Sequence, residues 1–244
     1  GKITLEARGG SIGEADTKED GTLKRDANKG IRILNSGSEN QSDVTLRAKE
    51  NVYVTGVASA DGKTTAKDGK AGSLDLTVGY LDKTGKTDGT LTNIGISVDG
   101  TLNLTGNIKS SETASIYTAK DLTVDKTVSS KNTYVGSIGD MTFTGKALEG
   151  TDTLTLEAEK SINQTKGSAI AANTKAKAGK NINLTSTTNK LQNVSIDAKN
   201  GSATIVNAND ADGDLNVTTV GKVANDLTIT NLKNGKANAV RFDK

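Results

Sequence analysis

A short alternating phrase recurs along the chain: an apolar residue, then Thr or Asn, then a second apolar residue, often followed by Thr. Alternation of apolar and polar positions is typical of a β-strand with one buried and one solvated face. No window shows an apolar stripe at helical spacing, so we predict short strands and no long helix. The clearest copies lie at 102–105, 122–124, 141–144, 162–163, 182–185, 215–218 and 227–230, and looser copies occupy the first hundred residues.

The spacing of these phrases predicts the architecture. Five successive phrases start at 102, 122, 141, 162 and 182, at intervals of about 20 residues. In a sandwich or barrel, strand and loop lengths vary and the core holds aromatic residues, whereas here each interval repeats its predecessor. A coil of about 20 residues that stacks at the strand spacing of roughly 4.8 Å is a parallel β-helix. We therefore predict an all-β fold, a single-stranded parallel β-helix (solenoid), with inward-facing Leu104, Val124, Phe143, Leu184 and Val217.

Three polar stretches interrupt the period, and they are rich in Lys, Asp, Gly and Thr. We interpret the stretches near 13–30, 59–72 and 82–93 as long turns that protrude from the solenoid. The chain begins at Gly1 with no Met, and the pattern is already present at Ile3 and Leu5. We therefore expect residues 1–244 to be one continuous β-helix segment of a longer protein.

Composition agrees with a thin, repeated core. Hydrophobic residues make up 33% of the chain, aromatic residues make up 2%, and Pro is absent. Proline deletes a hydrogen bond in a sheet that has neighbours on both sides, so its absence fits stacked coils. The net charge is only +2, which leaves no electrostatic footprint for nucleic acid, and no apolar stretch is long enough to span a bilayer.

The absence of His and Cys restricts the chemistry. It excludes Ser-His-Asp and Cys-His nucleophiles, zinc sites of the ordinary kind and a disulfide framework. We expect no enzyme activity and no cofactor.

Several phrases resemble the repeat of filamentous-haemagglutinin-type exoproteins, the large adhesins of bacterial two-partner secretion. The resemblance covers most of the chain from about Thr101 onward and, more loosely, the first hundred residues. It implies a right-handed β-helical fibre, secreted or held at the bacterial cell surface and exported through an outer-membrane transporter. It further implies a role in adhesion, toxin delivery or biofilm formation. The partners implied are a host or neighbouring-cell receptor and, in fibre assembly, further copies of the exoprotein. The phrases that carry it are AGKNINLT (178–185), KDLTV (120–124), GDMTFT (139–144) and GTDTLTLEA (150–158).

One acidic stretch is a weak candidate for a metal site. Asp210, Asp212 and Asp214 alternate along the chain as ligands do in calcium loops. However, Gly213 is misplaced for an EF-hand and the Glu at the end of such a loop is missing. An Asp/Gly turn between two coils is the favoured interpretation.

Asparagine and threonine patterns offer two further candidates. Thr142 with Thr144 and Thr228 with Thr230 resemble the Thr ranks of ice-binding β-helices, but Asn, Asp and Lys interrupt the ranks, so a solvated β-surface is favoured.

Asn-x-Ser/Thr triplets, the acceptor sites of N-glycosylation, are expected from composition alone in such a chain, and most of them lie within predicted strands. The seven potential glycan acceptors are Asn40, Asn103, Asn163, Asn183, Asn193, Asn200 and Asn216.

Charged residues are candidates for the acid and base groups of a β-helical polysaccharide lyase, or for contacts with nucleic acid or anionic surfaces. Asp121, Asp125, Lys126 and Lys131 could act as acid and base groups, but Tyr53, Tyr80, Tyr117 and Tyr134 are too scattered for a sugar platform. We interpret the Lys-rich segments 63–70 and 173–180 as solvated turns.

These patterns leave three functions open. The favoured one is a structural shaft of an adhesin that presents a distal tip. The alternatives are a β-helical carbohydrate-active enzyme and a receptor-binding module that uses its protruding turns.

Overall fold

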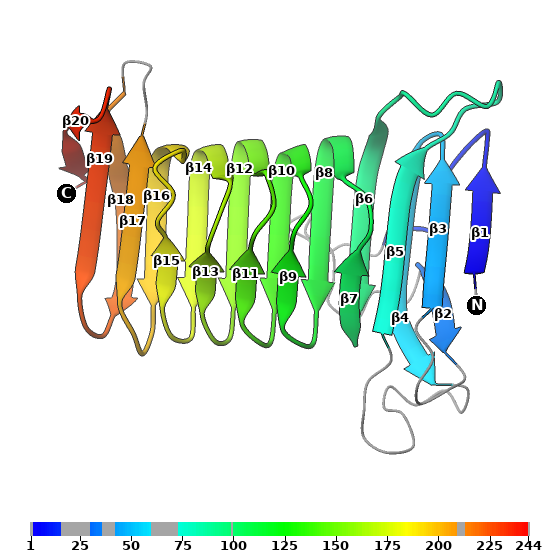
Figure 1. Ribbon diagram of the computed structural model, residues 1–244, viewed down its shortest axis with the longest axis horizontal. Coiled ribbons are helices and arrows are strands. Elements are labelled where there is room, and N and C mark those ends of the chain that lie inside the picture. The colour runs from blue at the N-terminus through cyan, green and yellow to red at the C-terminus, as the bar shows by residue number, and fades with distance from the viewer. Residues whose placement is uncertain are drawn as a thin grey trace. The chain divides into compact units, whose positions relative to one another are not determined.

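The computed structural model describes residues 2–15, 30–35, 42–59, 73–98, 100–208 and 213–243, and these ranges contain strands and no helix. No segment in them therefore forms a helix able to cross a membrane. The chain folds as a β-solenoid, which confirms the predicted all-β, parallel class (Figure 1). Residues 1–120 and residues 121–244 form two compact units.

The unit formed by residues 121–244 is the more regular one, because each of its first coils contributes one short and one long strand (Figure 1). The short strands form one parallel sheet: β9 (Leu122–Val124), β11 (Met141–Phe143), β13 (Ile162–Gln164), β15 (Ile182–Leu184), β17 (Ala203–Ala208) and β19 (Leu227–Lys233), with antiparallel β20 (Lys236–Ala237) at its end. The long strands form the other: β10 (Val128–Ser137), β12 (Ala147–Ala158), β14 (Ser168–Ala178), β16 (Lys190–Ala198) and β18 (Leu215–Val223), followed by β21 (Val240–Phe242).

Successive coils of this unit stack in register. Hydrogen-bonded partners one coil apart are separated by 20 residues for the side chains of Asn163 and Asn183, and by 21 for the Asn181 side chain and the Ser202 backbone N–H. Inward positions are aliphatic because each must pile onto the side chain of the preceding coil. The predicted inward residues Val124, Phe143, Leu184 and Val217 are all buried, which confirms the predicted register.

The long strands bend at a corner near their middle. In β12, Leu148 and Gly150 face inward before the corner, and Leu154, Leu156 and Ala158 face inward after it. Between Gly150 and Thr153 the pairing with β14 shifts register, and the two residues there are exposed. One long strand therefore covers two sides of the core.

The unit formed by residues 1–120 contributes four strands to each of two parallel sheets. One sheet has the order β1 (Lys2–Ala7), β3 (Ser42–Ala48), β5 (Ser73–Tyr80) and β7 (Thr101–Leu104). The other has the order β2 (Ile31–Asn35), β4 (Asn51–Ser59), β6 (Leu91–Val98) and β8 (Ile108–Thr118). Inward residues stack here too, and the predicted core residue Leu104 is buried.

Most coils of this first unit are longer than the predicted 20 residues, although Asn93 of β6 pairs with Thr113 of β8 at that spacing. Asn51 and Asn93, paired on neighbouring strands, are 42 residues apart, and Asp75 and Asn103 are 28 apart. The extra length falls in the predicted long turns. Most of the turns near 13–30 and 59–72 lies outside the described residues. The turn predicted at 82–93 ends earlier, because β6 begins at Leu91.

Candidate functional site

A ladder of polar side chains joins the turns that precede the short strands of the second unit. Asp121 Oδ1 accepts a hydrogen bond from the Asp140 backbone N–H at 2.9 Å, and Asp140 Oδ1 accepts one from the Ser161 N–H at 2.9 Å. One coil on, Asn181 Oδ1 accepts from the Ser202 N–H at 2.9 Å. Each side chain thus satisfies a turn N–H that has no strand partner, and the turns lock together coil by coil.

Glycine precedes several of these turn residues because the coils approach too closely for a side chain. A Cβ on Gly179 would lie 1.9 Å from the Glu159 carbonyl oxygen, and one on Gly139 would lie 1.9 Å from Asp121 Oδ1. The Gly-x-Asn or Gly-Asp pair before a short strand is therefore explained by packing between coils.

A buried amide cluster replaces aliphatic packing at one corner of the second unit. Gln164 lies in the inward position that Phe143 and Leu184 occupy in the flanking coils. Its Nε2 donates to Asn189 Oδ1 at 2.8 Å, while Asn189 Nδ2 donates to Gln164 Oε1 at 2.9 Å. Asn189 Oδ1 also accepts from the Ala169 N–H at 2.7 Å, so this buried pair caps the backbone as well.

The amide cluster continues into the following coils. Asn207 Oδ1 accepts from the Leu191 N–H at 2.7 Å, and its Nδ2 donates to the Leu191 carbonyl at 3.0 Å. The same Nδ2 lies 3.0 Å from Asn231 Oδ1. This cluster was not predicted from the sequence, although the replacement of an apolar residue by Gln164 in the repeated phrase was a signal that could have found it.

A small hollow lies beside the cluster. It is lined by Phe143, Leu148, Gln164 and Ala169, among others, and its volume is about 10 Å³. That volume is at the lower limit for one water molecule, so this hollow has no room for a sugar or a nucleotide.

Five of the seven potential glycan acceptors lie in strands, as predicted: Asn103, Asn163, Asn183, Asn193 and Asn216. Each of these five takes part in a side-chain ladder with a neighbouring coil, for example Asn193 Nδ2 with Asn173 Oδ1 at 3.0 Å. Asn200 is exposed in a turn, and Asn40 lies outside the described residues. The ladder amides are therefore already engaged in joining coils.

The weak metal candidate is described only in part. Asp214 pairs with Arg241, whose Nε donates to Asp214 Oδ2. Asp210 and Asp212 lie outside the described residues, and within the described ranges no three His, Cys, Asp or Glu side chains gather as metal ligands would. Asp214 therefore has a structural partner of opposite charge.

The proposed acid and base residues hold different positions in the second unit. Asp121 belongs to the turn ladder and lies 3.8 Å from Lys160 Nζ, whereas Asp125 pairs with the adjacent Lys126 at 2.8 Å. The strand β9 separates the two carboxylates, which is a path of roughly 13 Å at the rise of a strand. Lys131 lies at the exposed corner of β10.

The four tyrosines are scattered over different strands, as predicted. Tyr117 is buried in β8, and Tyr134 in β10 donates its hydroxyl to Glu157 Oε2 at 3.1 Å. Burial raises the pKa of Tyr53 in β4, and a hydrogen bond with Asn93 lowers it by a smaller amount.

The rank of threonines that would resemble an ice-binding face is interrupted, as predicted, because Thr142 stacks on Asn163 in the next coil.

One interpretation of a Lys-rich segment was wrong. Residues 173–178 belong to strand β14 and are not a turn. Ala176 and Ala178 face the core, which directs Lys175 and Lys177 to the solvated face. Alanine is a weak apolar signal, so the alternation in this segment does not stand out in the sequence. The segment 63–70 lies outside the described residues.

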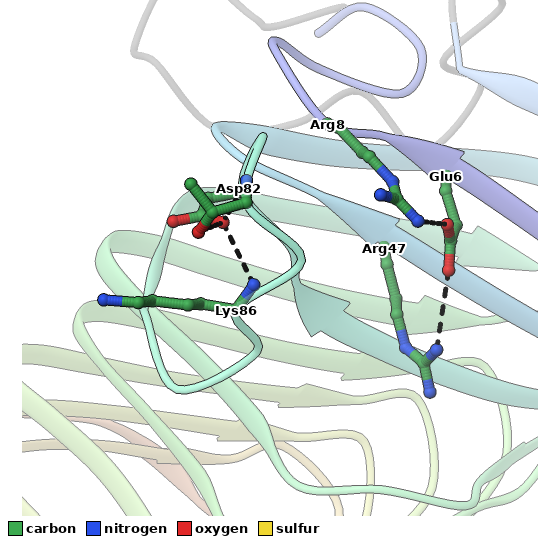
Figure 2. Close-up of polar contacts among 6 residues, drawn as sticks. Glu6, Arg8, Arg47, Asp82 and Lys86 are labelled. Atoms are coloured by element: carbon green, nitrogen blue, oxygen red, sulfur yellow. Dashed lines mark hydrogen bonds and ion pairs between the residues drawn. The ribbon is translucent and has the colours of Figure 1, made fainter.

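In the first unit, the turn after β5 has a defined structure of its own. Asp82 Oδ1 accepts hydrogen bonds from the Thr84 hydroxyl at 2.7 Å, the Thr84 N–H at 2.8 Å and the Lys86 N–H at 3.0 Å (Figure 2). Gly85 takes a φ of 85° inside this turn. The hydrogen bond from the Thr84 hydroxyl, followed by that from the Lys86 N–H, holds the pKa of Asp82 below its ordinary value. Residues 83–89 are exposed on this scaffold.

A second polar group comes from β1, from Arg8 in the turn directly after it, and from β3. Figure 2 shows the guanidinium groups of Arg8 and Arg47 reaching the same carboxylate. Arg8 is 3.2 Å from Glu6 Oε2, and Arg47 is 3.6 Å from Glu6 Oε1. All three side chains are partly exposed, so the pairs contribute little to stability.

The chain matches no family model, no curated protein and no solved structure.

Proposed function

We propose that residues 1–244 are a structural shaft segment of a secreted, cell-surface bacterial adhesin or exoprotein. The segment extends a binding or effector tip away from the cell. Its partners are an outer-membrane transporter during secretion and a host or neighbouring-cell receptor at the tip. The repeat phrases that resemble filamentous-haemagglutinin-type exoproteins suggest this setting.

One structural observation carries the proposal: polar side chains bond across successive coils at the turns and on the outer faces. Asp121, Asp140, Asn181 and Ser202 join the turns, while Asn173, Asn193 and Asn216 form an amide row along the long-strand sheet. These ladders add to the backbone hydrogen bonds of the parallel sheets and resist bending and shear between coils. Stiffness along the stack is the property that a shaft requires.

The turn held by Asp82 supports a second role, direct receptor binding. Its backbone is organised by three hydrogen bonds to one carboxylate oxygen, whereas its outward side chains are free to vary without disturbing the core. Binding by this turn is compatible with a shaft that also makes lateral contacts.

A surface-display experiment tests the shaft. The chain is placed between an outer-membrane anchor and a nanobody tip, and capture of antigen-coated beads is measured on cells that carry a polysaccharide brush. Deleting one whole coil, Met141–Ser161, should keep the fold and reduce bead capture modestly, because neighbouring coils can restack. Deleting only Met141–Gly150 should abolish display of the tip, because it puts the remaining coils out of register.

The outcomes are separable. The shaft role would be contradicted if a nanobody fused directly to the anchor captured as many beads as a nanobody carried by the segment. Bead capture by the segment without the nanobody, lost when residues 83–89 are exchanged for a Gly/Ser turn, would instead support receptor binding by the turn. Cleavage of a polysaccharide that one Asp or Lys substitution abolishes without unfolding would support the enzyme.

A further inference from the structure

The outer face of the long strands in the second unit carries charges that alternate in sign from coil to coil. Glu157 of β12 pairs in the ladder with Lys177 of β14, and Lys177 pairs with Asp197 of β16. On β18 a register shift places two residues, Gly221 and Lys222, beside Asp197. The charge row, formed by Glu157, Lys177, Asp197 and Lys222, therefore reads negative, positive, negative, positive along the solenoid.

Charges in the middle of this row are available to an external partner. Lys177 and Lys222 are exposed, and within the described residues no ion pair joins either of them to a carboxylate. Asp197 Oδ1 has no hydrogen-bond partner in that part of the chain. A carboxylate with an unsatisfied oxygen gains more from an added cation than one that is already paired.

The rest of this face is flat and mostly uncharged. No aromatic side chain lies on β12, β14, β16 or β18, so the face has no platform on which a sugar or a base could stack. Its best complement is a second flat polar surface with alternating charges. The other outward residues form two rows along the solenoid: Thr153, Asn173, Asn193 and Asn216 in one, and Thr155, Lys175, Ser195 and Thr219 in the other.

We propose that this face binds the same face of a second copy of the chain. The two-fold axis runs parallel to the strands and passes between β14 and β16. In that arrangement, Lys177 lies opposite Asp197 of the second copy, and Asp197 lies opposite its Lys177. One coil further out, Glu157 lies opposite Lys222 of the second copy. The face thus complements itself, as a two-fold interface requires.

Like charges disfavour the nearest alternative registers. A two-fold axis through β14 would place Lys177 opposite the same residue of the second copy and Glu157 opposite its Asp197. An axis through β16 would place Asp197 opposite the same residue of the second copy. In the proposed register every member of the charge row meets the opposite sign, and Asn173 meets Asn193 of the second copy as an uncharged contact.

The contact is small, so the dimer should be weak. Four strands with about five outward-facing positions each cover roughly 19 Å by 17 Å, which is about 300 Å² per copy. A standard stable interface buries about 800 Å² per partner. The expected dissociation constant is on the order of 100 µM, and it should rise as salt screens the exposed charges.

This two-fold axis makes the two solenoid axes antiparallel. For the shaft proposed above, antiparallel pairing joins shafts that extend from two facing cells, where many weak contacts act together. That consequence rests on the proposed function, whereas the dimer itself does not.

Mixing two single charge variants of the full chain tests the pairing. In sedimentation velocity at low salt, Lys177→Glu and Asp197→Lys should each raise the dissociation constant roughly tenfold, because each homodimer has like charges in contact twice. An equimolar mixture of the two variants should associate as the unaltered chain does. The mixed dimer opposes the new carboxylate to the new ammonium and keeps the native Asp197–Lys177 contact on the other side of the axis.

Two controls accompany the mixture. Lys166→Glu reverses an exposed lysine in the turn after β13, away from this face, and should leave the association unchanged. Circular dichroism checks that each variant keeps its strand content.

Cross-linking locates the interface, because the chain contains no cysteine. Ser195 of β16 lies beside the proposed axis, and packed sheets are about 10 Å apart, so a bis-maleimide of roughly that length should join two copies of the Ser195→Cys chain. The matched control is Thr204→Cys, an equally half-buried position on β17 of the short-strand sheet, which should stay uncross-linked.

Three results would overturn the proposal. The first is a chain that stays monomeric at about 500 µM in low salt. The second is a mixture of the two charge variants that associates no better than either variant alone, since the dimer would then use another surface. The third is equal cross-linking of the Ser195→Cys and Thr204→Cys chains. All three are measured in solution without cells or a tip, so failure of the shaft experiment leaves them unaffected.

Discussion

Gln164 and Asn189 exchange two hydrogen bonds inside the solenoid, one amide donating in each direction at 2.8 and 2.9 Å. The two residues are 25 positions apart, and both are buried. Their exchange connects one coil to the corner of the next. A buried polar pair of this kind stabilises only while every member is satisfied.

Removing one member of this pair should therefore be costly. Asn189→Ala leaves Gln164 and the Ala169 N–H without their buried partner, and we expect a loss of about 2–4 kcal/mol in the free energy of unfolding. The control Asn173→Ala removes an exposed ladder amide and should cost less than about 1 kcal/mol. Urea denaturation measures both variants. Equal losses would show that the buried cluster is not a special source of stability.

The inward register predicts opposite effects for two adjacent residues. Leu184 is fully buried, so Leu184→Asp should unfold the neighbouring coils, because an unpaired buried charge costs several kcal/mol. Asn183 faces outward, where its Nδ2 donates to Asn163 Oδ1 at 2.9 Å. Asn183→Asp should cost about 1 kcal/mol at most, since the Asn163 amide can turn its NH₂ group toward the new carboxylate. Similar melting temperatures for the two variants would refute the register.

Glycine at the coil contact gives a third prediction. Gly179→Ala places a Cβ 1.9 Å from the Glu159 backbone carbonyl, and a rigid backbone cannot yield cheaply. We expect a loss of about 2–3 kcal/mol, the range of overpacked sites. Gly10→Ala meets no atom within 4 Å and should change stability by less than about 0.5 kcal/mol. Thermal melts of both variants provide the comparison, and a harmless Gly179→Ala would mean that the coils can move apart.

The turn held by Asp82 should respond to acid. The pKa of Asp82 is lowered in the folded state, so its ionised carboxylate stabilises the turn. This contribution is fully present at pH values above the ordinary pKa of Asp, and it is lost as the pH falls through the lowered pKa. In an NMR titration, the amide signals of Thr84 and Lys86 should move together with the Asp82 carboxyl, at a pH below that of an unperturbed Asp. Asp82→Asn should remove the transition. A midpoint at or above the ordinary value would contradict the hydrogen-bonded turn.

The coil itself was predictable because its physics is local and repeated. Alternation of apolar and polar residues decides which face of a strand is buried, and Leu104, Val124, Phe143, Leu184 and Val217 are all buried as predicted. The period of about 20 residues then selected a solenoid over a sandwich. The prediction is wrong where the pattern is weak: Ala176 and Ala178 carry too little apolar signal to mark a strand, so the sequence predicts a turn where part of β14 lies. The right-handed sense and the continuity of the helix over 1–244 stay predictions.

The amino-acid sequence by itself determined the strand class, the coil period and the inward faces, since each depends on residues close together in the chain. Only the tertiary structure decided which polar groups meet. Gln164 and Asn189, Asp121 and the Asp140 N–H, and Arg47 and Glu6 lie one or more coils apart. Stacking distance and coil length together set these contacts, and neither can be read from a single coil.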